Sequence, residues 1–154
     1  MQITNQYNSN GNREGLWCDY HHNGQLHYEG NYIDGKENGY FEIYDSKGNL
    51  HSKGNYVNGE KDGYWETYYE DKKLKRRLSF VNCELCGSSE HYYENGQLLS
   101  KGNHLNGKAY GLWEYYHSTG YIHSRGYYVN GVEDGYWENF LDDGKLHSKE
   151  MFIN

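Results

Sequence analysis

The glycines of this chain are the feature that most restricts its fold, because all 20 fall into four positions of a 24-residue repeat. One of the four positions is filled six times without a slip, by Gly15, Gly39, Gly63, Gly87, Gly111 and Gly135. Self-similarity at a period of this length is typical of an array in which each unit contacts mainly its neighbours. The spacing predicts a single repeat domain over 1–154, with a partial unit at 1–14 and units at 15–38, 39–62, 63–86, 87–110, 111–134 and 135–154.

Composition narrows the architecture further. The mean hydropathy is -1.15, yet 18% of the residues are aromatic and 19 of them are Tyr. Such a chain is too polar for a thick globule, but too aromatic and too regular for disorder. The absence of Pro leaves every strand its full set of backbone donors. Composition therefore favours a thin β-sheet whose faces are rich in Tyr.

The charge and the termini restrict the possible partners. A net charge of -7 argues against nucleic acid as the main ligand and permits a basic partner. No stretch approaches the ~20 apolar residues of a membrane span, and the first ten residues do not resemble a signal peptide. We therefore expect a cytoplasmic protein for which membrane binding is a minor prospect. An odd number of Cys, three, does not suggest a disulfide framework.

The chain consists of runs of aromatic and β-branched residues broken by Asn-Gly and Asp-Gly, which is typical of β-hairpins. In the unit 39–62 we expect strands at 40–45 and 50–57. Asn23-Gly24, Asn95-Gly96 and Asp143-Gly144 suit a two-residue type I′ turn between such strands. A six-residue connection, such as 58–63, then leads to the next unit. The sequence predicts an all-β protein, a single elongated antiparallel meander of about thirteen strands.

The predicted turn sets a register that the charges support. It places an acidic residue opposite a basic one in five of the six hairpins, and Cys18 opposite Glu29 in the first. The five pairs are Glu42–Lys53, Glu66–Arg77, Glu90–Lys101, Glu114–Arg125 and Glu138–Lys149. A shift of one residue would send every side chain to the other face, so the pairs are strong evidence for the register.

The same register predicts that bulky rings lie across strand glycines. It sets Trp17 over Gly30 and Trp113 over Gly126 in the same hairpin, and Trp137 over Glu150. One face then carries the Trp, Leu, Gly and Tyr columns and is the more buried. The other face carries further tyrosines, the charged pairs and a column of His.

The run from Gly54 to Gly59, followed by Gly63-Tyr64-Trp65-Glu66, recurs at 30–42 and 126–138. This pattern resembles MORN-type repeats, and most of all the bacterial variant in the YwqK-family antitoxins. The resemblance extends over 11–154. It implies a stack of β-hairpins that acts as a protein-binding or membrane-associating scaffold, and for bacterial members a role as antitoxins or immunity proteins.

The middle of the chain departs from the pattern. Three expected glycines are replaced, by Lys72, Leu78 and Cys83, and Ser89 stands where the other units have an aromatic ring. The missing ring predicts a notch that a partner could fill, although sequence drift explains it equally well. The candidate partner-binding residues are those around this notch and one further indole, namely Trp65, Leu78, Phe80, Ser89, Tyr93 and Trp113. For the Trp column itself we favour a structural role over a recognition stripe.

Other reactive residues have plainer explanations. Successive members of the His column (His27, His51, His123 and His147) would be ~9–10 Å apart, too far for shared zinc ligation, so we read them as exposed partners of Tyr. Cys83 and Cys86 could form half a zinc knuckle or a redox pair, but ordinary loop cysteines explain them better. The basic run 72–77 could touch an anion, a lipid headgroup or RNA, or be a solvated surface paired with nearby acids. We predict no metal site and no cofactor.

The sequence shows no catalytic constellation and no phosphate-binding glycine loop. It predicts a non-enzymatic protein-binding module, an antitoxin or immunity protein that neutralises a toxin by direct binding. Many nuclease toxins are basic, and an acidic partner would associate with them faster. The alternative is a membrane- or lipid-associating MORN scaffold.

Overall fold

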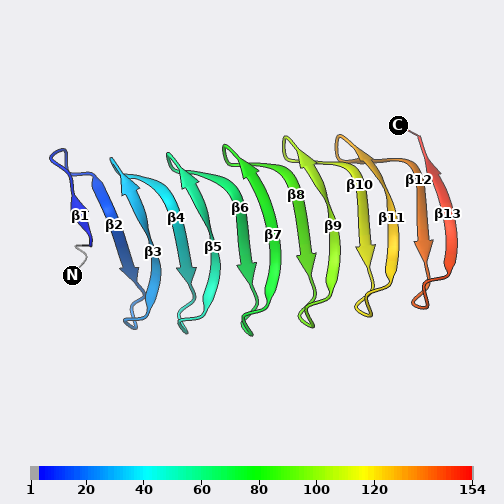
Figure 1. Cartoon of the computed structure of the whole chain (residues 1–154), viewed down its shortest axis with the longest axis horizontal. Coiled ribbons are helices and arrows are strands. Elements are labelled where there is room, and N and C mark those ends of the chain that lie inside the picture. The colour runs from blue at the N-terminus through cyan, green and yellow to red at the C-terminus, as the bar shows by residue number, and fades with distance from the viewer. Residues whose placement is uncertain (1–3, 154) are drawn as a thin grey trace. The chain divides into compact units, whose positions relative to one another are not determined.

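A computed structural model describes residues 4–153 of the chain, which fold into β-strands joined by turns, and the described part contains no helix. The strands follow one another in chain order, and within each compact part of the chain neighbouring strands pair antiparallel, as predicted (Figure 1). Within 4–153 there are thirteen: β1 (Gln6–Tyr7), β2 (Arg13–Tyr20), β3 (Leu26–Ile33), β4 (Lys36–Tyr44), β5 (Leu50–Val57), β6 (Glu60–Tyr68), β7 (Leu74–Val81), β8 (Glu84–Tyr92), β9 (Leu98–Leu105), β10 (Lys108–Tyr116), β11 (Ile122–Val129), β12 (Val132–Phe140) and β13 (Leu146–Phe152).

The chain divides into two compact units. The N-terminal unit contains β1–β6 together with residues 80–83, and the C-terminal unit contains residues 74–79 together with β8–β13. The edge strand suspected within residues 1–10 is the short β1, which pairs with β2. Residues 1–3 lie outside the described residues.

The turn inside each predicted hairpin differs from the prediction. The Asp45 N–H donates to the Asn49 carbonyl (2.9 Å) and the Gly48 N–H donates to the Asp45 carbonyl (2.9 Å). Of this turn only Gly48 has a positive φ, at 83°. This is a three-residue loop that ends in a left-handed glycine. The same bonds recur at 21–25, 93–97 and 141–145, so the two-residue type I′ turn predicted there is wrong.

Type I′ turns are found instead at the other end of the strands. Asn58 and Gly59 have φ values of 53° and 87°, and Val57 stands opposite Glu60. Two consecutive positive φ values define this turn and explain the Asn-Gly sequence. The predicted six-residue connection at 58–63 is therefore wrong, because β6 begins directly after the turn. The Gly59 N–H also donates to the carbonyl of Glu37 in the preceding 24-residue repeat (2.8 Å).

The predicted charge register is confirmed within each unit, for example by Glu42 opposite Lys53 and Glu114 opposite Arg125. Glu66 and Arg77 belong to different units, so their pairing stays a prediction. Near the loop the register shifts by one residue, because the longer loop introduces a bulge. Tyr44 therefore stands opposite Leu50, and the assignment of the Leu column to the Trp face is wrong.

The core consists of rings that lie on bare backbone. Trp65 is only 4% exposed, and a Cβ atom added at Gly54 would lie 2.4 Å from its ring. The Trp65 Nε1–H donates to the Asn55 carbonyl (2.8 Å), so the polar edge of the indole is also satisfied. Each ring covers the glycine of the hairpin before it, rather than that of its own hairpin as predicted. The ring-on-glycine pairs are Phe41 on Gly30, Trp65 on Gly54, Trp113 on Gly102 and Trp137 on Gly126.

Candidate protein-binding surface

Strand alternation gives the sheet of each unit two different faces. The indole face carries the buried residues Trp17, Phe41 and Trp65 in the N-terminal unit, and Trp113 and Trp137 in the C-terminal unit. The ladder face, on the opposite side of the same strands, carries the rows of Glu with Lys or Arg. The indole face is stabilised by its own ring contacts, such as Tyr56 with Trp65 at 4.8 Å between centroids.

Three of the candidate residues predicted from the sequence are buried. Trp65 and Trp113 lie flat on the backbone, which is the structural role favoured for the Trp column. Ser89 is 1% exposed, and its Oγ is 2.8 Å from His104 Nδ1. The Ser89 hydroxyl is therefore already satisfied within the C-terminal unit.

The remaining candidates are half-buried and are divided between the units. Phe80 packs against the core cluster that contains Trp65 in the N-terminal unit, whereas Leu78 and Tyr93 belong to the C-terminal unit. The Tyr93 hydroxyl donates to the Tyr116 carbonyl (2.8 Å). The residues predicted to wall a notch beside Ser89 belong to both units, so the notch and its part in partner binding stay predictions.

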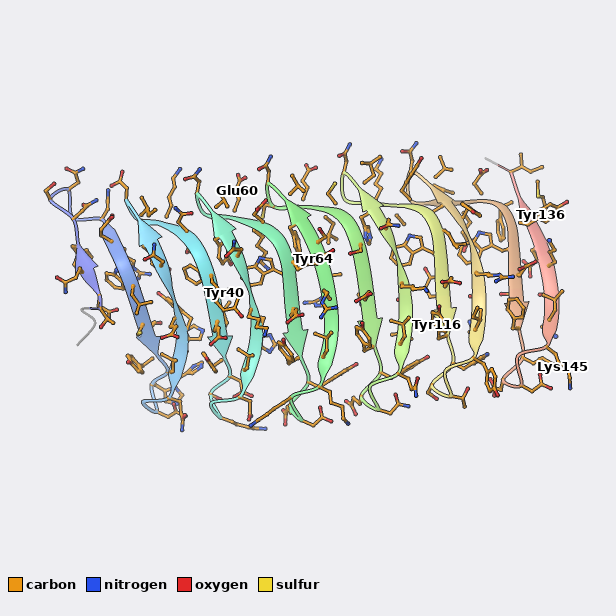
Figure 2. All side chains as sticks on the ribbon, in the orientation of Figure 1. Tyr40, Glu60, Tyr64, Tyr116, Tyr136 and Lys145 are labelled. Atoms are coloured by element: carbon orange, nitrogen blue, oxygen red, sulfur yellow. The ribbon has the colours of Figure 1, made fainter. Side chains whose placement is uncertain are left out.

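A group of large exposed side chains lies on the ladder face of the C-terminal unit. We call it the outer patch; its members come from four consecutive strands, β10 to β13. They are Leu112, Tyr127, Tyr136 and Met151. Leu112 stands opposite Tyr127, and Tyr136 stands opposite Met151. Tyr136, labelled on β12 in Figure 2, is 59% exposed, and the Lys149 Nζ lies 4.5 Å from its ring centroid.

Among the described residues of the N-terminal unit, Asn stands opposite two apolar residues of the same row. Leu16 faces Asn31, and Tyr40 faces Asn55. Sequence reasoning assigned a tyrosine column to this face but did not single out the patch. The available signal was the replacement of Asn by Tyr127 and Met151 at one repeat position.

Below this row, charged side chains form ion pairs that run along the ladder face. In the C-terminal unit Lys101 Nζ is 2.9 Å from Glu114, Arg125 Nε is 2.8 Å from Glu138, and both basic residues lie on the strand preceding their partner. Each of these two basic residues therefore pairs with the Glu of the next hairpin, whereas the prediction paired it with the Glu of its own hairpin. Lys149, which is 3.3 Å from Glu138, does pair within its own hairpin.

These contacts shift the titration of the groups involved. The hydrogen bond from Lys101 lowers the pKa of Glu114, and the hydrogen bond from Tyr116 adds to this effect. Partial burial acts in the opposite direction but does not cancel it. The Arg125 hydrogen bond lowers the pKa of Glu138, with Lys149 adding to it. In the N-terminal unit the hydrogen bond from Tyr44 to Glu42 raises the pKa of Tyr44 to about 12. Glu114 and Glu138 are thus held in their ionised form.

The other predicted reactive residues have mixed outcomes. The bulge places Leu26, not His27, opposite Tyr20, so the reading of this His as a direct partner of Tyr is wrong. The His27 ring instead lies 4.4 Å from that of His21. In the part of the chain that the structure describes, no group of three or more His, Cys, Asp and Glu is arranged to hold a metal ion.

The cysteines and the basic run are placed as follows. Cys83, in a left-handed turn position (φ 66°), and Cys86, on β8, both have free thiols. Of the basic run, Lys73 is 2.7 Å from Asp71 and Arg77 is 3.4 Å from Glu90. These two side chains are paired with acids, as the reading of the run as a solvated surface predicted.

The comparison with known families matches this architecture. The MORN repeat variant family matches five times, at residues 13–34, 37–58, 61–82, 85–106 and 133–154. The chain belongs to the MORN repeat variant family. The matched segments cover more than half of the chain, and the same glycine period and strand pairing continue through β10 and β11 of this MORN array. No curated protein matched the chain. Residues 4–153 contain no helix that could cross a membrane.

Proposed function

We propose that this MORN repeat protein is a non-catalytic module that binds another protein, and that it neutralises a toxin by covering it. The observation that carries the proposal is the outer patch of Leu112, Tyr127, Tyr136 and Met151. A group of exposed apolar side chains rimmed by charges is typical of a protein-interaction site. Tyr is also among the residues that contribute most to binding energy in interfaces.

Two further properties support an interaction role. The strands that carry the patch are fixed by backbone pairing and by buried indoles, so the side chains are presented with little loss of backbone entropy on binding. The net charge of -7 would speed association with a basic toxin and disfavour an anionic membrane. For this reason we place toxin neutralisation ahead of a lipid-associating scaffold.

The test is co-expression with the product of the adjacent gene in a growth-rescue assay. Tyr127→Ala combined with Tyr136→Ala should abolish both rescue and complex formation. Tyr121→Ala is the matched control, because Tyr121 is a similarly exposed tyrosine that lies outside the patch. The proposal fails if the neighbouring product is not toxic or not bound, or if the double variant rescues growth as well as the wild type.

A further inference from the structure

Two basic residues of the C-terminal ladder lie in the same kind of setting. Lys101 lies between Glu114 (2.9 Å) and the ring of Tyr116 (5.8 Å). Arg125 likewise lies between Glu138 and the ring of Phe140, at 2.8 and 5.5 Å. In these two hairpins the Glu and the aromatic residue two positions later therefore bind a cation from the preceding strand. We call this Glu and aromatic pair a cation seat.

In the described part of the N-terminal unit, one cation seat is occupied by a Lys and another faces a Glu instead. Lys53 lies in the seat formed by Glu66 (3.5 Å) and Tyr68 (5.6 Å). Glu42 and Tyr44 form the corresponding seat on β4. The residue that stands opposite Glu42 on the preceding strand, where the other seats receive Lys or Arg, is Glu29.

Neither carboxylate of this rung has an ion pair among the described residues. Glu42 accepts hydrogen bonds from the hydroxyls of Tyr44 and Tyr40, and the Cys18 Sγ–H donates to Glu29 at 3.8 Å. Lys53, although opposite Glu42, forms its ion pair with Glu66. Like charges directly opposite on neighbouring strands destabilise a sheet, whereas elsewhere the ladder pairs opposite charges. The rung thus combines a cation-binding geometry with an excess of negative charge.

The surroundings have the same sign. The N-terminal unit contains twelve acidic and seven basic side chains, a net charge of -5, against ten and eight, a net charge of -2, in the C-terminal unit. Two exposed tyrosines of the same unit, Tyr20 and Tyr40, add aromatic surface. Exposed Tyr rings attract cations through their faces. The ladder face of this unit is therefore complementary to a basic, and not to an acidic or neutral, protein surface.

We propose that the Glu29–Glu42 rung, with Tyr44, binds an arginine side chain from a basic segment of the protein partner. This inference rests on the proposed function and names the chemistry of the partner. A guanidinium can donate to two carboxylates at once while its plane packs on an aromatic ring, which an ammonium group cannot do. The bound arginine takes the place that Lys or Arg of the chain itself takes in the other seats.

The experiment measures binding of a fluorescein-labelled peptide of alternating Arg and Ser by fluorescence anisotropy to the full chain. Glu29→Lys inserts a cation into the seat and Glu42→Gln removes its carboxylate. Each should weaken binding about tenfold. Glu114→Gln, the matched control in the C-terminal ladder, should change the affinity by less than about twofold. A peptide with citrulline in place of Arg should not bind.

Thermal melting separates loss of binding from loss of folding. Glu29→Lys replaces a like-charge rung by an opposite-charge rung, so its Tm should rise while its affinity falls. Unchanged affinity in both Glu29→Lys and Glu42→Gln would overturn the inference, as would equal weakening by Glu114→Gln. If Glu29→Lys neutralises the toxin fully while the outer-patch variant does not, the proposed function stands and this inference fails.

Discussion

Two rungs of the indole face carry their larger side chain on opposite strands of the pair. In the N-terminal unit Trp65 lies on Gly54, so the bulk comes from the later strand. In the C-terminal unit the equivalent positions are Ser89 and Leu78, so the larger side chain belongs to the earlier strand. The ion pair between Arg77 and Glu90 (3.4 Å) aligns the two strands there, and Ser89 is nonetheless buried. The comparison teaches that the layer requires a filled volume, not a tryptophan at a fixed position.

The same exchange alters the lateral contact within the hairpin. Trp113 packs edge-on against Tyr128, with ring centroids 6.0 Å apart. At the altered rung the Ser89 hydroxyl hydrogen-bonds to His104 instead. A ring contact has therefore been replaced by a hydrogen bond between the buried Ser89 hydroxyl and a half-buried imidazole.

The largest expected difference between the two rungs is the cost of truncation. Trp65→Ala should lower the free energy of unfolding by about 3–5 kcal/mol, because it removes a buried indole. Ser89→Ala, at the same repeat position, should cost only about 1 kcal/mol through the lost hydrogen bond to His104. Urea denaturation of both variants measures the difference. Equal losses would mean that the two rungs do not share one packing principle.

The glycine under the ring is the next test. Gly54→Ala should cost about 1–3 kcal/mol, since the added Cβ would overlap the Trp65 ring. In a Trp65→Ser background the same substitution should cost much less, because the obstructing ring is absent. A double-mutant cycle by chemical denaturation gives the coupling energy. Additive effects would contradict the packing described here.

The altered rung can be converted to the regular one. Ser89→Trp alone should destabilise the fold by about 1–3 kcal/mol, because it forces an indole into a position that is only 1% exposed, while Leu78 stands where the other rungs have a glycine. Adding Leu78→Gly should recover at least half of that loss, which can be read from thermal melts of the single and double variants. If Leu78→Gly makes Ser89→Trp worse, the two positions do not compensate each other.

The two rungs should also respond differently to acid. Burial lowers the pKa of His91, with the charges of Arg76 and His104 adding to it, and burial lowers the pKa of His104. The folded chain then binds fewer protons than the unfolded chain just below pH 6.5, so stability should fall as the pH drops through and below that value.

The N-terminal unit has Thr67 at the repeat position of His91. His91→Thr should therefore flatten the dependence of Tm on pH between 7.5 and about 5. Melts of wild type and variant across this range provide the measurement. An unchanged slope would show that His91 does not contribute to it.

The smallest expected effect concerns the charge ladder. Glu114→Gln should cost about 0.5 kcal/mol, because its pair with Lys101 is partly exposed and is screened by salt. The loss should shrink in 1 M salt. A loss as large as that of Trp65→Ala would mean that the ladder, rather than the indole face, is the main source of stability.

Much of the fold could be predicted because the repeat samples each position several times. The antiparallel strand order and the opposition of Glu to Lys or Arg followed from period and charge alone. The prediction assigned the two kinds of turn to the wrong ends of the strands, because Asn-Gly occurs at both ends. A glycine at the end of a three-residue loop looks the same in sequence as one in a type I′ turn. Only the φ values of Asn58 and Gly48 separate the two.

The candidate surface was harder to predict. Sequence spacing paired each indole with the glycine of its own hairpin, whereas the ring leans onto the hairpin before it, a choice that depends on rotamer and sheet twist. The outer patch depends on Tyr127 and Met151 replacing Asn at one position, which is visible in the repeat alignment but has meaning only once the exposed face is known.

The hydrogen bond from the Gly59 N–H to the carbonyl of Glu37 has an evolutionary consequence. The same donor and acceptor positions meet again where Gly131 bonds to Ala109. Every internal hairpin thus offers at its end the acceptor that its successor requires. A duplication of one 24-residue block in the gene would leave no backbone group unsatisfied, so such a protein can lengthen or shorten its binding surface by whole hairpins.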